Sequence, residues 1–111
     1  MKVVYIAGPF RAANAWLIEA NIRRAEALAL EVWRLGAACL CPHTNTRFFQ
    51  NAAPDEVWLE GDLAMLERCD ALMLTTDWRE STGATVERGR ALARGMPVFE
   101  TLADLRDWLA L

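Results

Sequence analysis

The sequence predicts an α/β fold in which helices cover both faces of a parallel four-stranded sheet. Short apolar segments alternate with longer stretches of helical periodicity along the chain, an order typical of parallel strands joined by right-handed crossovers. The apolar segments are nearly uninterrupted, which fits parallel strands because both of their faces are buried. The expected class is therefore a flavodoxin-like or Rossmann-like three-layer sandwich with strand order 2-1-3-4.

The expected elements alternate from the first strand to a terminal helix. The first strand ends at the breaker pair Gly8-Pro9, and Gly36 stops the long helix that follows. Pro42 closes the second strand, and residues 43–47 are expected to form a polar loop. The expected strands span residues 2–7, 37–41, 70–75 and 97–99, and the expected helices span residues 14–35, 54–68, 83–94 and from 102 onward.

Composition limits the classes of function. With 111 residues the chain is expected to form one domain, 1–111, and no run approaches the roughly 20 apolar residues of a membrane span. The net charge of −3 comes from interspersed acids and bases, which argues against extended nucleic acid as a partner. The cysteines Cys39, Cys41 and Cys69 are odd in number and form no CxxC pair, so we expect buried thiols and a cytoplasmic protein.

The segment from Ser81 to Glu87 is the most informative motif. It follows an apolar strand and a turn, so it is expected to be a loop that opens a helix. Unpaired backbone N–H groups at a helix N-terminus favour anions, and Ser81 and Gly83 are candidates to hold a phosphate beside the Glu87 carboxylate. The alternative is structural, because Ser at an N-cap and Glu in the first turn also stabilise helices.

The predicted strand order places a crevice between the carboxyl ends of the first and third strands, where ligands bind in such folds. Two loops enter it, Gly8-Pro9-Phe10-Arg11 and the segment from Asp77 to Ser81. Arg11 and Ser81 are expected to converge there on one anion, because the guanidinium fork suits phosphate. The alternative for Arg11 is a solvated loop arginine.

Asp62 lies where packing gives no reason for an acid. On a helix it shares one face with the apolar residues Trp58, Met65, Leu66 and Cys69. Desolvation there raises the pKa of a carboxyl group and keeps it protonated near neutrality, as a general acid requires. The alternative is a structural aspartate at a helix–sheet junction, satisfied by an arginine.

Glu87 supplies a second carboxylate. It lies in a stripe of small residues, Gly83, Ala84 and Ala91, which allows close approach to the sheet and leaves room for a ligand. One protonated and one ionised carboxyl group form the arrangement that breaks glycosidic bonds. The pair Asp62 and Glu87 therefore predicts that chemistry.

Two further residues border the expected crevice. His43 follows the second strand and is either substrate-facing or a hydrogen-bonded loop histidine; with Cys39 and Cys41 it lacks the fourth ligand of a zinc site, so no metal is expected. Trp78 precedes Ser81, where its ring would either stack on a base or cover the edge of the core.

These segments together resemble the nucleoside 2-deoxyribosyltransferase superfamily. The matching motifs are Tyr5-Ile6-Ala7-Gly8-Pro9-Phe10-Arg11, Gly61-Asp62-Leu63, Cys69-Asp70-Ala71-Leu72, and Ser81-Thr82-Gly83-Ala84-Thr85-Val86-Glu87 with Gly89 and Ala91. They occur in the family's order and spacing and extend from Lys2 to Val98. The resemblance is greatest to the small branch that includes 2'-deoxynucleoside 5'-phosphate N-hydrolases and short deoxyribosyltransferase-like proteins.

The resemblance implies a role for each matching position. Glu87 matches the nucleophile that attacks the anomeric carbon, Asp62 the aspartate that protonates the departing base, and Tyr5 the tyrosine beside them. Arg11 and Ser81 match 5'-phosphate contacts, and Gly8 matches the backbone turn. Pro9 departs from the hydroxyl residue that the nucleotide hydrolases tend to carry, and we expect no extension after the last helix to reach a partner subunit's active site.

The leading hypothesis is cleavage or transfer of an N-glycosidic bond in a nucleoside or nucleoside 5'-monophosphate, without metal or organic cofactor. The alternatives are a nucleotide-binding or sensing module without chemistry, and a protein-interaction domain on the same scaffold. A homodimer or higher homo-oligomer is expected because so small and apolar a domain leaves hydrophobic surface uncovered.

Overall fold

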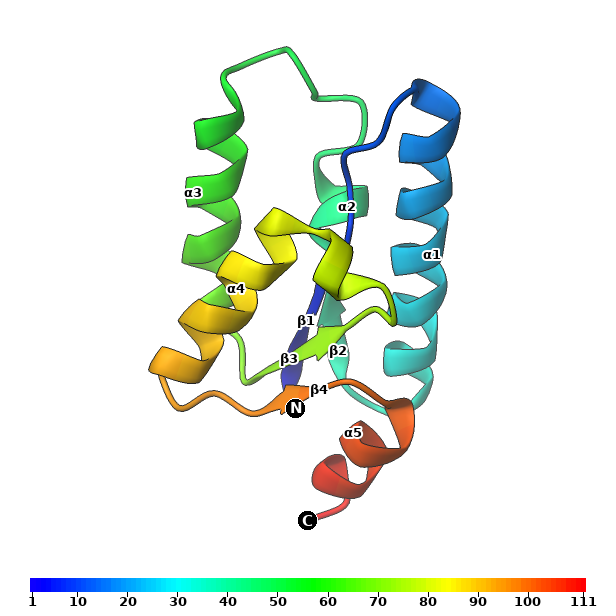
Figure 1. The fold of residues 1–111 in the computed structure, drawn as a ribbon. Coiled ribbons are helices and arrows are strands. Elements are labelled where there is room, and N and C mark those ends of the chain that lie inside the picture. The colour runs from blue at the N-terminus through cyan, green and yellow to red at the C-terminus, as the bar shows by residue number, and fades with distance from the viewer.

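The structure is a computed structural model that describes residues 1–111 (Figure 1). All four strands are parallel, and their order across the sheet is β2-β1-β3-β4, so the predicted fold class and order 2-1-3-4 are confirmed. The strands are β1 (Val3–Ala7), β2 (Ala38–Leu40), β3 (Ala71–Leu74) and β4 (Val98–Phe99). The helices are α1 (Ala15–Arg34), α2 (Pro42–Asn45), α3 (Asp55–Leu66), α4 (Thr82–Ala93) and α5 (Leu102–Leu109), with the 3₁₀ helix η1 (Trp78–Glu80).

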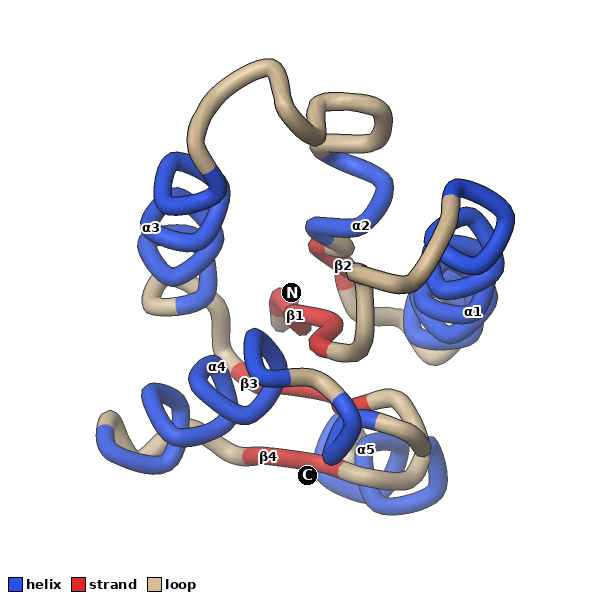
Figure 2. The backbone as a smooth tube through the Cα atoms, turned by 45° about the horizontal axis from the view of Figure 1, so that its top comes forward, coloured by secondary structure: helices blue, strands red, loops and turns tan.

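The sheet is the middle of three layers, because side chains of a strand alternate between its faces. In β1, Val4 and Ile6 pack into one apolar cluster with residues of α1 and α5. Tyr5 and Ala7 pack into a second cluster with residues of α3 and α4. Figures 1 and 2 show α3 and α4 together on one side of the sheet, with α1 on the other. Each β1 side chain therefore belongs to one helix layer.

Local signals explain where the helices begin. The side chain of Asn14 accepts a hydrogen bond from Leu17 N, that of Ser81 from Ala84 N, and that of Thr101 from Asp104 N. Each therefore satisfies one of the backbone donors that a helix N-terminus leaves free. Gly36 ends the first crossover with φ of +93°, a backbone conformation that favours glycine.

Two short elements differ from the sequence prediction. Residues 42–45 form α2 where a polar loop is predicted, with Pro42 at the start of the helix, where its missing N–H costs nothing. Residues 78–80 form η1 within the expected turn before Ser81. Elements this short carry too few residues for a hydrophobic period, so the pattern does not reveal them. None of the helices combines the length and the apolar character that a membrane span requires.

Candidate active site

Tyr5, Asp62 and Glu87 come together on the side of the sheet covered by α3 and α4. Tyr5 is fully buried in the middle of β1, and its hydroxyl donates a hydrogen bond to Oε2 of Glu87 on α4. Asp62 on α3 is partly buried and acts electrostatically on both of them. An ion pair between Arg90 and Glu67 also joins α4 to the end of α3. Three separate elements therefore contribute one cluster of ionisable side chains.

Burial dominates the electrostatics of this cluster. It raises the pKa of Asp62 from its ordinary value to about 6. Burial, with a further contribution from the Asp62 charge, raises the pKa of Glu87 to about 7, against the opposing effect of the Tyr5 hydrogen bond. Burial and the two neighbouring carboxylates raise the pKa of the Tyr5 hydroxyl, which therefore stays protonated as a donor. Both carboxyl groups therefore titrate close to neutral pH.

The sequence predicts the raised pKa of Asp62 but not that of Glu87. The two pKa values also lie in the opposite order to the predicted roles, because the higher value belongs to Glu87 and not to Asp62. The pair can still share one proton, because two interacting carboxyl groups release their protons in two steps that belong to both. Near the midpoint of these steps the pair holds about one proton. Such a pair supplies both the acid and the nucleophile that cleave a glycosidic bond.

The loop after β1 is held by side chains from two helices. His43 is buried at α2, and its Nε2–H donates to the carbonyl oxygen of Pro9 at 2.9 Å. Asn21 of α1 donates from Nδ2 to the carbonyl oxygen of Phe10 at 3.1 Å. Burial lowers the pKa of His43, so the ring is neutral at physiological pH. His43 therefore serves as the hydrogen-bonded histidine that the sequence allows, and it fixes the backbone at Pro9.

Gly8 lies where the backbone of this loop meets the end of β3. A Cβ atom built at Gly8 would stand 2.4 Å from the Oγ1 atom of Thr75. Thr75 is buried, and its hydroxyl donates to Oδ1 of Asp77 at 2.8 Å. Asp77 thus braces the loop after β3, with Arg24 of α1 at 3.7 Å from its other oxygen.

The predicted anion contacts have protein partners in this structure. Arg11 is exposed and forms an ion pair with Asp55 at the start of α3. The Ser81 hydroxyl accepts from Ala84 N as the cap of α4, and Gly83 lies in the first turn of that helix. Trp78 is buried in the core cluster, and its indole N–H donates to Glu100 at 2.9 Å. Trp78 thus covers the edge of the core, which is one of its two predicted roles.

Sequence reasoning misses several residues that position this site. Thr75 and Asn21 are buried polar residues whose bonds hold the two loops, but neither belongs to a motif. Asp55 at the start of α3 belongs to no motif either, and it pairs with Arg11. The available sequence signal is the position of Thr75, a hydroxyl residue directly after an apolar strand.

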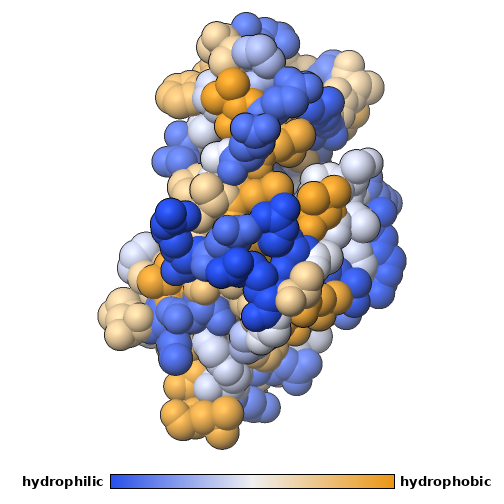
Figure 3. Space-filling view, turned by 90° about the vertical axis from the view of Figure 1, so that its left-hand side faces the viewer, coloured by the Kyte–Doolittle hydropathy of each residue, from blue (hydrophilic) through white to orange (hydrophobic).

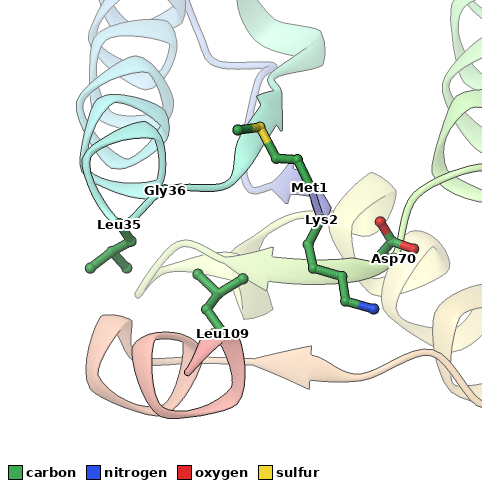
Figure 4. Close-up of a pocket in the computed structure, with 6 residues that line it drawn as sticks. All are labelled: Met1, Lys2, Leu35, Gly36, Asp70 and Leu109. Atoms are coloured by element: carbon green, nitrogen blue, oxygen red, sulfur yellow. The ribbon is translucent and has the colours of Figure 1, made fainter. Parts of the chain in front are cut away.

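Two surface hollows lie away from the cluster. One, of about 390 Å³, lies at the amino ends of the strands, where Met1 and Lys2 lead into β1, as Figure 4 shows; Leu35, Gly36, Asp70 and Leu109 complete its lining. The other, of about 280 Å³, is lined by residues of α1 and by Thr75 and Thr76. No group of three or more His, Cys, Asp or Glu side chains is arranged to hold a metal ion.

Comparison with known proteins places the chain in a family. A 2-deoxyribosyltransferase from the psychrotolerant bacterium Bacillus psychrosaccharolyticus has a similar structure, with a TM-score of 0.62 and 21% sequence identity over 86% of this chain and 69% of that chain. The likeness shows a shared fold. A search of curated proteins found no match. A family model described as a domain of unknown function, DUF4406, matches residues 2–100, and the chain therefore belongs to that family.

Proposed function

We propose that this protein cleaves the N-glycosidic bond of a nucleoside or a nucleoside 5'-monophosphate and passes the sugar to water or to a second base. The observation that carries the proposal is the hydrogen bond from Tyr5 to Glu87, with Asp62 coupled to both. The similar fold of a 2-deoxyribosyltransferase supports this class of chemistry. The small nucleotide N-hydrolase branch of that superfamily is the proposed relative.

Each residue of the cluster has one role in the proposed reaction. The ionised carboxylate of Glu87 attacks the anomeric carbon of the sugar, and the bond between that carbon and the base nitrogen breaks. The bonding electron pair leaves with the base, which takes a proton from Asp62. Water or a second base then attacks the same carbon and releases Glu87 as a carboxylate. The proton lost by the incoming group returns to Asp62, so the cycle closes without a cofactor.

Tyr5 orients the nucleophile. Its hydroxyl holds one oxygen of Glu87, so the other oxygen is left for the sugar carbon. A donor to an ionised acceptor stabilises the charged form, which offsets part of the burial that raises the pKa of Glu87. Because Tyr5 is fully buried in a central strand, this orientation is fixed before substrate arrives.

The substrate contacts that we propose surround this cluster. A 5'-phosphate would take the place of Asp55 as the partner of Arg11 and would accept from backbone N–H groups at the start of α4, near Ser81 and Gly83. The loops braced by Asp77 and His43 would shape the pocket, with Gly8 and Pro9 as its backbone wall. Trp78 would support that wall from the core.

Assays of base release test this proposal directly. Purified protein is incubated with a panel of nucleosides and their 5'-monophosphates, and free base is separated and quantified. We expect release from at least one member of the panel and near-complete loss of release in Glu87→Gln, with an unchanged circular dichroism spectrum. Addition of a second base distinguishes transfer from hydrolysis. Binding without any release in the wild type would instead support a nucleotide-binding module.

We also propose that the protein is a cytoplasmic homodimer. Four apolar side chains on α3 and α4 are about half exposed: Val57, Leu59, Val86 and Leu92. Figure 3 shows apolar patches on this side of the molecule, separated by a hydrophilic band. A second copy would cover them. The three cysteines are all free thiols, which fits a reducing compartment. Sedimentation velocity tests the dimer, and a monomer at micromolar concentration would exclude it.

A further inference from the structure

The stretch of chain from α2 to the first turn of α3 holds most of the polar atoms that lack partners. Five buried side-chain N or O atoms make no hydrogen bond, and four of them lie between residues 43 and 58: His43 Nδ1, Arg47 Nε, Gln50 Oε1 and Trp58 Nε1. Figure 1 shows this segment as it arches across the top of the molecule from α2 to α3. A buried unpaired donor or acceptor costs about 1–3 kcal/mol unless water or a ligand satisfies it. The concentration of four such atoms in one stretch of the chain therefore indicates a binding site for a polar ligand.

Trp58 is the member of this set nearest to the proposed chemistry. It lies one helical turn before Asp62, and residues four apart on a helix are neighbours, with about 5–6 Å between their Cβ atoms. Helical side chains also lean toward the N-terminus, so Asp62 leans toward Trp58. Both are partly buried, on the face of α3 that also carries the buried Leu66. The Trp58 indole N–H therefore belongs to the same side of α3 as the acid.

The position of the indole ring is fixed by packing. The ring of Phe49 lies 5.6 Å from that of Trp58 at an interplanar angle of 48°. In the adjoining region, Asn45 of α2 contacts the sulfur of Met65 on α3 at 4.0 Å. Contacts therefore join the chain at and after α2 to α3 at two places, Met65 and Trp58. An indole N–H held by such contacts can discriminate between ligands, because it cannot reorient toward a ligand whose acceptor lies elsewhere.

We propose that Trp58 determines which base this protein accepts: its indole N–H donates to a carbonyl oxygen of the leaving base, beside the nitrogen that receives the proton from Asp62. This inference rests on the proposed function, which supplies the base and its protonation. A purine with a carbonyl at position 6 presents two neighbouring acceptors, N7 and O6, whereas a 6-amino purine presents an acceptor and a donor. An indole N–H is only a donor, so it pairs with the carbonyl and opposes the amino group.

Matched purine nucleosides that differ only in the 6-oxo or 6-amino group test this inference. We expect the wild type to favour the 6-oxo compound in kcat/KM. Trp58→Phe keeps an aromatic ring against Phe49 but removes the donor. We expect it to lose about ten-fold in kcat/KM for the 6-oxo compound and to change less than about two-fold for the 6-amino compound, which is the loss of one hydrogen bond. Trp33→Phe, on the half-exposed surface of α1, is the matched control.

Binding separates this inference from the proposed function. The affinity of Glu87→Gln for the same two nucleosides is measured by calorimetry, with and without Trp58→Phe. Glu87→Gln should bind the 6-oxo compound more tightly, and this preference should disappear in the double variant. That result supports the role of Trp58 even if the wild type shows no turnover. Base release with equal losses for both compounds in Trp58→Phe overturns the inference and leaves the proposed function standing. Failure of both nucleosides to bind overturns the inference as well.

Discussion

The phenolic hydroxyl of Tyr5 donates a hydrogen bond to Oε2 of Glu87, a residue 82 positions further along the chain. This bond joins the middle of the central strand β1 to the first half of α4. Burial and the Asp62 charge oppose the ionisation of Glu87 and the hydrogen bond favours it, and these effects together set the pKa of that carboxyl to about 7. Tyr5 therefore controls when the proposed nucleophile is ionised.

The first prediction concerns the dependence of base release on pH. The reaction needs ionised Glu87 and protonated Asp62, so the rate falls in acid as Glu87 gains a proton and in alkali as Asp62 loses one. The pKa values of about 7 and about 6 place the expected maximum of the kcat/KM profile between them. The profile is measured from pH 4 to 9 with one nucleoside. A rate that keeps rising above pH 8 would contradict the role of Asp62 as acid.

The second prediction concerns Tyr5→Phe. Removing the hydroxyl removes a donor to the ionised form of Glu87, so the pKa of Glu87 rises and the acid limb of the profile moves to higher pH. We expect kcat/KM at neutral pH to fall about ten-fold or more, as for the loss of a hydrogen bond to a charged group. Thermal unfolding monitors the fold. An acid limb that stays in place would show that Tyr5 acts only in packing.

The third prediction concerns Asp62→Asn. Without an acid, the departing base must leave as an anion, and we expect base release to fall by about 10²–10⁴-fold. A 4-nitrophenyl glycoside needs no protonation of its leaving group, so its hydrolysis should be nearly unchanged. Glu60→Gln on the exposed side of the same helix is the control and should keep full activity. If Asp62→Asn lowered the activity on both substrates equally, Asp62 would position the reacting groups and would not act as the acid.

The fourth prediction concerns stability and pH. The ordinary pKa values of Asp62 and Glu87 are 3.8 and 4.5, and folding raises them to about 6 and about 7. The folded protein therefore binds more protons in this interval, and the contribution of this pair to the unfolding free energy falls as the pH rises from about 4 through about 7. Glu87→Gln removes one titration and keeps an acceptor for Tyr5.

Urea unfolding of wild type and Glu87→Gln at pH 4.5, 6 and 8 measures this effect. We expect the unfolding free energy of the variant to increase relative to that of the wild type as the pH rises. The increase should be a few kcal/mol at most, since one pKa unit corresponds to about 1.4 kcal/mol. The difference between the two proteins cancels the contribution of other groups. A constant difference from pH 4.5 to 8 would mean that Glu87 has an ordinary pKa in the folded protein.

The fifth prediction concerns the close approach of the loops after β1 and β3. Gly8→Ala places a Cβ atom 2.4 Å from the Thr75 hydroxyl, so the two loops must separate. We expect a loss of about 1–3 kcal/mol in unfolding free energy, with partial recovery when Thr75→Ala is added. Gly61→Ala has nothing within 4 Å and should be neutral or stabilising. Equal stabilities of Gly8→Ala and Gly61→Ala would contradict the close approach.

The fold class and the strand order could be predicted from the amino-acid sequence. Apolar strands, helix caps such as Asn14 and Ser81, and a stop such as Gly36 are local signals with a fixed physical cause, so the main helices begin and end within a few residues of their predicted bounds. It also marked Asp62, because an acid on an apolar helix face stands out from its neighbours.

The contacts between polar groups could not be predicted in this way, because they depend on the packing of the whole chain. Tyr5 and Glu87 are joined across 82 residues, Arg11 pairs with Asp55, and the indole N–H of Trp58 is left without a partner. A periodic pattern fixes the face on which a residue lies, but the partner of a side chain depends on how the crossovers bring separate elements together. The strength of a charge–charge contact depends on burial by all of those elements, which no single segment of sequence contains.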